Sequence, residues 1–207
     1  MTKPDWEGAV MFEARGLIFD CDGTLADTMP AHFRAWTAVT SRYGLTFPEQ
    51  RFYELGGVPS HRIAALLAHE QGKTIDPDRL AREKEEAFLE HLPAIQPVAA
   101  VVALAKSAAG RLPMAVASGG FRPVITQVLR QLGILEIFQA IVTAEDTVRH
   151  KPEPDVFLEA AKRLGVEPKW CAVYEDTDIG LEAARRAGMA AIDVRPMYGQ
   201  NGASRRP

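Results

Sequence analysis

The feature that most constrains the fold of this chain is a short apolar run that ends in two closely spaced aspartates. Residues 17–28 read Leu-Ile-Phe-Asp-Cys-Asp-Gly-Thr-Leu-Ala-Asp-Thr. The apolar residues 16–19 predict a strand that is buried in a parallel sheet. Such a strand delivers the next residue, Asp20, to the crevice at its carboxyl end, where open α/β sheets bind their ligands. An aspartate-rich turn after an ordinary strand is the alternative interpretation, because a short motif needs structural context.

Asp20 and Asp22 are one residue apart, so their side chains point in different directions along an extended chain. The two carboxylates can therefore have different roles. One can attack and bind a hard cation, while the other transfers a proton. Gly23 allows the backbone to turn away directly after them. Cys21 lies between the two acids and is a conceivable nucleophile, but the alternation of side chains directs its thiol away from them.

Composition argues against several classes of protein. At 207 residues, 47% of them hydrophobic, the chain is long enough for one good core and a smaller second unit. The net charge of −3 gives no electrostatic reason to bind nucleic acid or an anionic membrane, and no apolar run is long enough to span a bilayer. The first 13 residues lack an apolar segment, so we do not interpret them as a signal peptide. Cys21 and Cys171 are expected to be buried free thiols in a reducing compartment, which favours a cytoplasmic protein.

Residues 29–92 are predicted to be helical, without any strand. The pattern indicates helices at 30–43, 48–55, 60–70 and 76–91. The first helix is expected to end at Gly44 and to bury a single face, which consists of Phe33, Trp36, Thr37, Thr40 and Tyr43. Ser60 is expected to cap the third helix. We interpret the whole segment as a helical insertion.

From residue 97 onwards, helices and strands alternate. Helices are expected at 98–109, 123–132, 154–164 and 179–187, and strands at 114–117, 140–143, 171–174 and 190–194. This alternation predicts right-handed βαβ units, and therefore an α/β protein with a parallel Rossmann-like sheet and an inserted helical cap. The expected division is a core of residues 13–28 and 93–196, a cap of residues 29–92, and terminal extensions of residues 1–12 and 197–207.

Polar residues follow the predicted strands at their carboxyl ends: Asp20 and Asp22, Ser118 with Gly119 and Gly120, and Glu175 with Asp176. These ends share one edge of a parallel sheet, so the polar residues converge on one crevice, which Lys151 can also reach. Asp20 and Asp176 offer the carboxylate oxygens that Mg²⁺ prefers. Ser118 and the backbone N–H groups beside it can hold phosphate oxygens, and Lys151 supplies a compact positive charge. The pattern predicts a site for Mg²⁺ and phosphate.

These motifs resemble those of the haloacid dehalogenase superfamily, in its β-phosphoglucomutase-like branch. Residues 20–24 match the first motif of the family, 118–119 the second, 151–152 the third and 175–178 the fourth. The four motifs occur in order on predicted strand ends, and the resemblance covers residues 15–195. The stretches 81–84, 111–116 and 150–155 are most similar to bacterial phosphatases that act on fructose 1-phosphate and 6-phosphogluconate. The resemblance therefore implies a small phosphorylated metabolite as substrate.

The resemblance also implies a covalent mechanism. Asp20 would attack phosphorus to form an aspartyl-phosphate, and Asp22 would protonate the leaving oxygen and later activate water. The implied cofactor is Mg²⁺, held by Asp20, the main-chain carbonyl of Asp22 and Asp176, with Glu175 in contact or through water. A true dehalogenase has no need of a general acid at Asp22. The implied phosphate-binding groups are Ser118, Gly119 and Lys151.

Several residues match family positions in the cap but also have simpler interpretations. His32 matches a histidine that positions the general acid, or it is a surface histidine. Thr28 lies where the family couples cap closure to the acid; it can also cap the following helix, and the two roles are compatible. Lys84 matches a lysine that reaches the substrate, or it belongs to a solvated, charged helix face. His61 and Arg62 are further candidates to face the substrate.

Two residues near the later motifs are given structural roles. His150 is expected to be a structural neighbour of Lys151. Asp178 is expected to cap the helix that follows it or to hydrogen-bond the metal shell.

Two classes of function remain open. The first is a Mg²⁺-dependent phosphatase or mutase that acts on a small phosphorylated metabolite, and the second is a catalytically silent protein that binds a ligand or partner. The complete set of motif residues favours an enzyme. Ser60 occupies the place of an arginine that clamps a second phosphate in β-phosphoglucomutases, which favours a hydrolase over a mutase. We expect a monomer or a weak homodimer.

Overall fold

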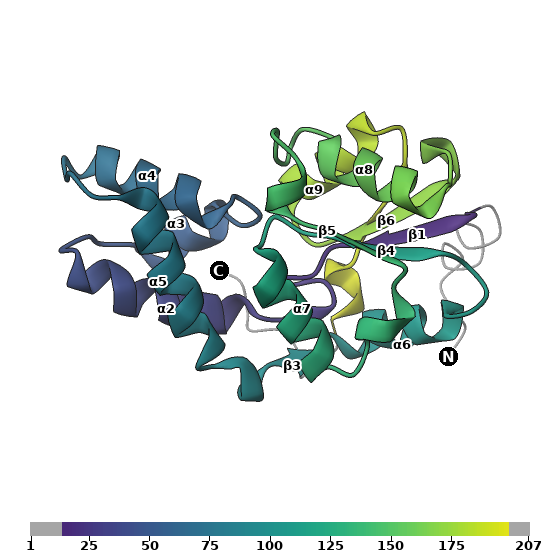
Figure 1. Ribbon diagram of the computed structural model, residues 1–207, viewed down its shortest axis with the longest axis horizontal. Helices are drawn as coiled ribbons and strands as arrows, with labels where there is room; N and C mark the ends of the chain where they lie inside the picture. Colours follow the sequence, from purple (N-terminus) through teal and green to yellow (C-terminus); the bar gives the residue numbers. More distant parts are fainter. Residues whose placement is uncertain (1–13, 199–207) are drawn as a thin grey trace.

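The computed structural model describes residues 14–198, and within this range five parallel strands form one sheet in the order β5-β4-β1-β6-β7. The strands are β1 (Gly16–Phe19), β4 (Met114–Ala117), β5 (Ala140–Val142), β6 (Cys171–Glu175) and β7 (Ala190–Asp193). Helices cover both faces of the sheet (Figure 1): on one face α8 (Asp155–Leu164) and α9 (Asp178–Arg186), and on the other α6 (Ala99–Ala108) and α7 (Arg122–Gln131). The predicted α/β fold with a parallel sheet is confirmed.

The central strand β1 is buried on both sides because helices lie on both faces of the sheet. Leu17 and Phe19 belong to the apolar cluster under α6 and α7, whereas Ile18 belongs to the cluster under α8 and α9. The ring of Phe19 stacks on Tyr174, with 4.8 Å between the ring centres. Phe19 is also level with Val116 of β4 and with Tyr174 of β6 in the parallel register. The residues that follow these three strands therefore emerge at the same edge.

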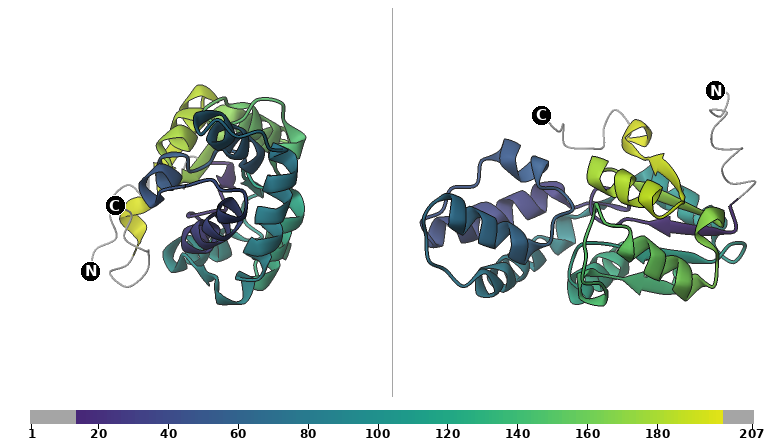
Figure 2. Two further views of the ribbon diagram at one scale, coloured as in Figure 1. Left: turned by 90° about the vertical axis from the view of Figure 1, so that its left-hand side faces the viewer. Right: turned by 90° about the horizontal axis from the view of Figure 1, so that it is seen from above.

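Residues 29–92, all of them described, form helices without a strand, as predicted. The helices are α2 (Met29–Arg42), α3 (Glu49–Glu54), α4 (Ser60–Glu70) and α5 (Pro77–Leu89). They form a separate layer at one end of the sheet, which is clearest in the right-hand view of Figure 2. Asp76 caps α5, because its side chain accepts hydrogen bonds from the backbone N–H groups of Asp78 and Arg79.

The helix α2 differs from expectation in the side chains that it buries. Ala35 packs in the cluster of the sheet, and Trp36 packs in the cluster of the cap. Thr37 is exposed, and Phe33 and Tyr43 are half-buried. The prediction of a single buried face was wrong because α2 lies between the sheet and the other cap helices, and so it presents an apolar surface to each.

Ser60 does not cap α4, contrary to expectation. The N-cap position belongs to Pro59, and no side chain caps this helix. The Ser60 hydroxyl instead donates a hydrogen bond to Glu85 on α5, at 2.6 Å. The serine therefore connects two cap helices.

A two-stranded antiparallel sheet was not predicted. The strands β2 (Ala26–Asp27) and β3 (Gln96–Pro97) pair where the chain enters and leaves the helical cap. Two-residue strands are too short to show the alternation by which strands are recognised in a sequence. Their pairing holds the two connecting segments side by side.

The described chain ends close to the first motif. The hydroxyl of Tyr198 donates a hydrogen bond to the carbonyl oxygen of Gly23. Met197 and Tyr198 were predicted to belong to a terminal extension, but both pack against the core cluster. The rest of the predicted extensions, residues 1–12 and 199–207, lies outside the described residues. Among residues 14–198, no helix has the length and apolar character needed to cross a membrane.

Candidate active site

The first motif folds into a tight loop at the end of β1. The backbone N–H of Ala26 donates to the carbonyl oxygen of Cys21 at 3.0 Å, and Gly23 has a φ of 85°, which glycine adopts without strain. The thiol of Cys21 is buried in the core cluster, and burial raises its pKa well above the usual value. Cys21 is therefore no nucleophile for this site. Asp20 and Asp22, on either side of it, line a cavity between the sheet and the cap.

A buried lysine joins the first motif to the fourth. Lys151 Nζ donates to Asp20 Oδ1 at 2.7 Å and to Glu175 Oε2 at 2.6 Å. Burial lowers the pKa of Lys151, but the two carboxylates outweigh this effect and raise the pKa above its usual value. Burial and the charge of Glu175 raise the pKa of Asp20 well above normal, although Lys151 opposes them. The single ammonium group of Lys151 therefore does not neutralise all the carboxylates at this edge of the sheet.

Three of the four acids predicted at the sheet edge form one cluster. Ligand oxygens of Asp20, Glu175 and Asp176 lie within 4.8 Å of one another, and all three residues are buried. Thr24 donates a hydrogen bond to Asp176 Oδ1 at 2.8 Å, which orients this carboxylate. Buried carboxylates in excess over the single lysine need further positive charge, and hard oxygen donors are the ligands that Mg²⁺ takes. The residues present therefore fit a hard divalent cation.

Glu175 is held by hydrogen bonds on both of its oxygens. Oε1 accepts from the backbone N–H of Asp176 at 3.0 Å, and from the N–H and hydroxyl of Thr177, both at 2.8 Å. Gly180, in the first turn of α9, gives the side chain its room, because a Cβ at this position would lie 2.1 Å from Glu175 Cδ. Sequence analysis missed Gly180. Its signal was a glycine inside a helix, where glycine is otherwise unfavourable.

The second motif follows β4 and contacts the cap. Ser118 is buried, and its hydroxyl accepts a hydrogen bond from the N–H of Gly120 at 3.0 Å. A Cβ at Gly119 would lie 2.8 Å from the carbonyl oxygen of Gly57 in the cap. Core and cap therefore meet here backbone against backbone, and a larger residue at Gly119 would separate them.

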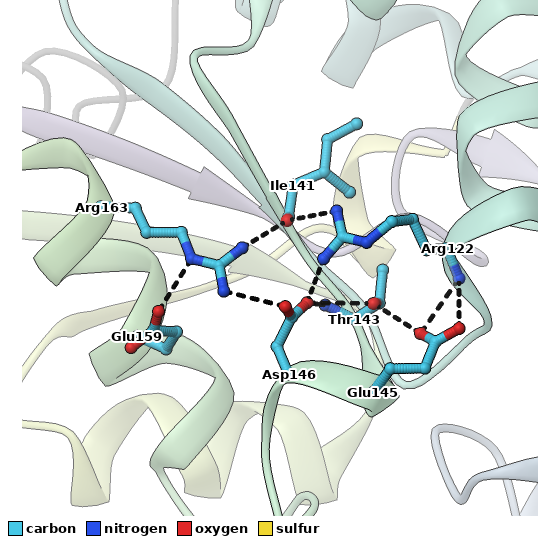
Figure 3. Close-up of polar contacts among 7 residues, drawn as sticks. All are labelled: Arg122, Ile141, Thr143, Glu145, Asp146, Glu159 and Arg163. Atoms are coloured by element: carbon cyan, nitrogen blue, oxygen red, sulfur yellow. Dashed lines mark hydrogen bonds and ion pairs between the residues drawn. The ribbon is translucent and has the colours of Figure 1, made fainter.

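A network of ion pairs fixes the start of the loop that carries Lys151 (Figure 3). Asp146 pairs with Arg122 at the start of α7 and with Arg163 on α8, the latter at 2.8 Å. Both guanidinium groups also donate to the carbonyl oxygen of Ile141, each at 3.0 Å. Since α7 follows the second motif and α8 follows the third, the network holds the two motif-bearing loops in one arrangement.

Thr28, directly before α2, and two residues of the cap converge on Asp22. Its Oδ1 accepts a hydrogen bond from the Thr28 hydroxyl at 2.7 Å and lies 3.1 Å from His32 Nε2. His32 Nδ1 lies 2.7 Å from Lys84 Nζ. Because an ammonium group only donates, Nδ1 accepts and Nε2–H donates to Asp22. Burial raises the pKa of Asp22, but the hydrogen bonds from His32 and Thr28 and the nearby charge of Lys84 lower it below its usual value.

The simpler interpretations of His32 and Lys84 are therefore wrong. His32 is buried, and its ring stacks on Phe88 with 3.9 Å between the ring centres. Lys84 is 3% exposed although it lies in a charged run, so it is no part of a solvated face. Thr28 occupies the N-cap position of α2, but its hydroxyl makes no capping bond because it turns to Asp22.

Four other predicted residues do not line the cavity. His61, Arg62, His150 and Asp178, all within the described chain, are not among its lining residues. The rings of His61 on α4 and His150 in the core lie edge to face, with 6.1 Å between their centres. Asp178 was expected to cap α9 or to bond the metal shell. Thr177 is the cap instead, and the exposed Asp178 pairs with Arg195 at 2.9 Å.

The fold and the site together define a class of enzyme: a hydrolase of phosphoric monoesters with an α/β fold, in which a helical cap lies over acids at the edge of a parallel sheet. Residues 14–188 match the model of the haloacid dehalogenase-like hydrolases, and the chain belongs to this family.

Named relatives agree with this assignment. The chain is 45% identical over 181 residues to fructose-1-phosphate phosphatase YqaB of Escherichia coli (strain K12), covering 87% of this chain and 96% of the relative. It is 28% identical over 199 residues to beta-phosphoglucomutase of Bacillus subtilis (strain 168), covering 89% and 86%. The crystal structure of CbbY from Rhodobacter sphaeroides in complex with phosphate matches with a TM-score of 0.78 and 26% identity, covering 91% of this chain and 89% of that one.

Proposed function

We propose that this enzyme is a Mg²⁺-dependent phosphatase that hydrolyses a small sugar phosphate through an aspartyl-phosphate on Asp20. The placement of Asp20 carries the proposal: it lines the cavity, 2.7 Å from the ammonium group of Lys151 and beside two further buried acids. The identity of 45% with a fructose-1-phosphate phosphatase supports a phosphorylated sugar as substrate. The match to CbbY in complex with phosphate supports phosphate binding on this fold.

The residues that would hold Mg²⁺ are Asp20, Asp176 and the main-chain carbonyl of Asp22, with Glu175 in contact or through water. When bound, Mg²⁺ would supply positive charge that offsets the repulsion between the Asp20 carboxylate and a phosphate dianion. The phosphate oxygens would be bound by hydrogen-bond donors of the core: Ser118, the backbone N–H of Gly119 and Lys151.

The reaction has two steps. In the first, a carboxylate oxygen of Asp20 bonds to phosphorus while the bond from phosphorus to the sugar oxygen breaks, and Asp22 gives its proton to that oxygen. In the second, water attacks phosphorus, its proton returns to Asp22, and phosphate leaves Asp20. The lowered pKa keeps Asp22 ionised in the free enzyme, which suits the base role. A phosphate dianion beside it would raise this pKa towards the acid role.

The cap supports a hydrolase rather than a mutase. A mutase holds a second phosphate, which needs a strong positive clamp. Ser60 carries no charge, and its hydroxyl donates to Glu85. Lys84 is engaged with His32. With β-glucose 1-phosphate and a trace of the 1,6-bisphosphate, we expect free phosphate to appear faster than glucose 6-phosphate, and the opposite order would assign a mutase.

The proposal is tested by phosphate release from a panel of sugar phosphates and one aryl phosphate. Release is expected with Mg²⁺, to stop when the metal is chelated and to resume when Mg²⁺ is added back. A protein that releases phosphate from no member of the panel would be a silent binding protein. Equal release with and without chelator would remove the metal from the proposal.

A further inference from the structure

The cap wall of the cavity contains an acid that the proposed reaction does not use. Glu85 lies on α5 beside Lys84, is 9% exposed, and lines the cavity together with Ser60. Burial of a carboxylate is costly even when the group is paired, so its position in the wall of a substrate cavity suggests a role in binding.

The hydrogen bonds to Glu85 from the described residues share one of its two oxygens. Ser60 Oγ donates to Oε1 at 2.6 Å, and Lys84 Nζ donates to the same atom at 3.0 Å. The second oxygen, Oε2, is thereby left to accept a hydrogen bond from a ligand in the cavity. A carboxylate is a strong acceptor for sugar hydroxyl groups, and the bond is charge-assisted.

The charges of this wall act against a second anion. Burial raises the pKa of Glu85, but the charge of Lys84 and the hydrogen bonds from Ser60 and Lys84 lower it, so the carboxylate is ionised at neutral pH. The ammonium group of Lys84 lies 3.0 Å from Glu85 and 2.7 Å from His32 Nδ1, so its charge is already compensated. An anionic group at this wall would meet a carboxylate, whereas an uncharged hydroxyl group would meet an acceptor.

We propose that Glu85 determines the class of sugar phosphate that the enzyme accepts, an inference that rests on the proposed phosphatase function. Its carboxylate binds hydroxyl groups of an uncharged sugar and rejects substrates that carry a second anionic group at that end. Ketose and hexitol monophosphates belong to the accepted class. Phosphorylated sugar acids and bisphosphates belong to the rejected class.

The test compares kcat/KM for fructose 1-phosphate, which has an uncharged sugar, with 6-phosphogluconate and fructose 1,6-bisphosphate, which carry a second anion. An aryl phosphate provides the reference rate, so a uniform loss of activity cancels in the ratios. We expect the wild type to prefer fructose 1-phosphate. In Glu85→Gln the amide keeps the shape but loses the charge, and the preference over both doubly anionic substrates should shrink at least about tenfold.

The neighbouring Glu86→Gln is the matched control, because Glu86 is exposed on the same helix and does not line the cavity. It removes the same charge from the same helix and should keep the wild-type preference. A second variant, Ser60→Lys, places a cation where a hydroxyl group now contacts Glu85 and should relax the preference in the same direction. Ser60→Lys therefore tests the effect of charge at this wall on substrate preference even if Glu85→Gln fails to fold.

A merely structural role for Glu85, as a partner for Lys84, would lower all rates together and leave the ratios unchanged. That result overturns the inference, as does a wild-type preference for 6-phosphogluconate over fructose 1-phosphate. In either case the enzyme is still an active sugar phosphatase, so the proposed function stands. Absence of phosphate release from every substrate overturns the proposed function and this inference together.

Discussion

Replacing Gly180 by alanine sets helix propensity against the packing of the active site. Alanine is the better helix former by about 0.5–1 kcal/mol, so propensity alone predicts a more stable protein. The structure predicts the opposite, because the new Cβ would lie 2.1 Å from Cδ and from Oε2 of Glu175. Carbon atoms in contact lie about 3.5–4.0 Å apart, so the carboxylate must retreat by roughly 1.5 Å.

This retreat separates Glu175 from its partners. Its 2.6 Å bond to Lys151 and its bonds to Thr177 cannot all survive such a displacement. Overpacking costs about 1–3 kcal/mol, which leaves a net loss of stability of up to about 2.5 kcal/mol after the gain in propensity. Because a displacement of about 1 Å in an active site costs on the order of 100-fold in rate, we expect kcat/KM to fall by about that factor.

Gly188, just beyond the other end of α9, provides the matched control. It has a φ of 71°, and a Cβ there would meet nothing within 4 Å. Alanine at Gly188 costs about 1–2 kcal/mol through its left-handed backbone, but kcat/KM should stay within about twofold of wild type. Urea unfolding and phosphate release are measured on both variants. A Gly180→Ala protein that is more stable than wild type and fully active would refute the packing argument.

Two further substitutions test other parts of the site. Asp22→Asn should lower kcat for a sugar phosphate by about 10²–10⁴-fold and for an aryl phosphate by less, because aryl oxygens leave without protonation; equal losses would remove Asp22 from the acid role. Burial raises the pKa of Asp146, but hydrogen bonds from Arg163 and Thr143 outweigh it and lower the pKa. The ion pairs of Asp146 therefore stabilise the fold fully above the pKa of an unfolded aspartate, about 3.9. This stabilisation is lost as the pH falls through the lower pKa of the folded state. Asp146→Asn should therefore be less stable than wild type by about 1–3 kcal/mol at pH 7, and this difference in unfolding free energy should shrink below about pH 4. Urea unfolding that gives the same difference at pH 7 and below about pH 4 would contradict the role of the network.

The meeting of the four motifs could be predicted because it depends on topology. Asp20, Ser118 and Glu175 each directly follow or end a strand of one parallel sheet, and parallel strands present their carboxyl ends at one edge. Lys151 reaches Asp20 although 131 positions separate them in the chain. Strand bounds such as those of β1 and β4 could be predicted to the residue, because short buried apolar runs between glycine or proline signals have few alternatives.

The inner surface of the cap could not be predicted in the same way. Lys84 and Glu85 lie in a charged run that is typical of a solvated helix, and their burial depends on His32, 52 positions away from Lys84, and on Ser60. Periodicity identifies a helix, but it does not show which polar groups find partners on other helices. The role of Gly180 likewise depends on where the Glu175 side chain lies, which no local pattern records.

Formation of an aspartyl-phosphate on Asp20 is the step on which the proposed reaction depends. The most direct measurement is mass spectrometry of enzyme that is quenched with acid during the first turnover of a sugar phosphate with Mg²⁺. We predict a phosphoryl group on the peptide that contains Asp20 in the wild type, and none in Asp20→Asn, which should release almost no phosphate. Rapid release of phosphate without a phosphorylated protein, or a phosphoryl group on a residue other than Asp20, would contradict the proposed mechanism.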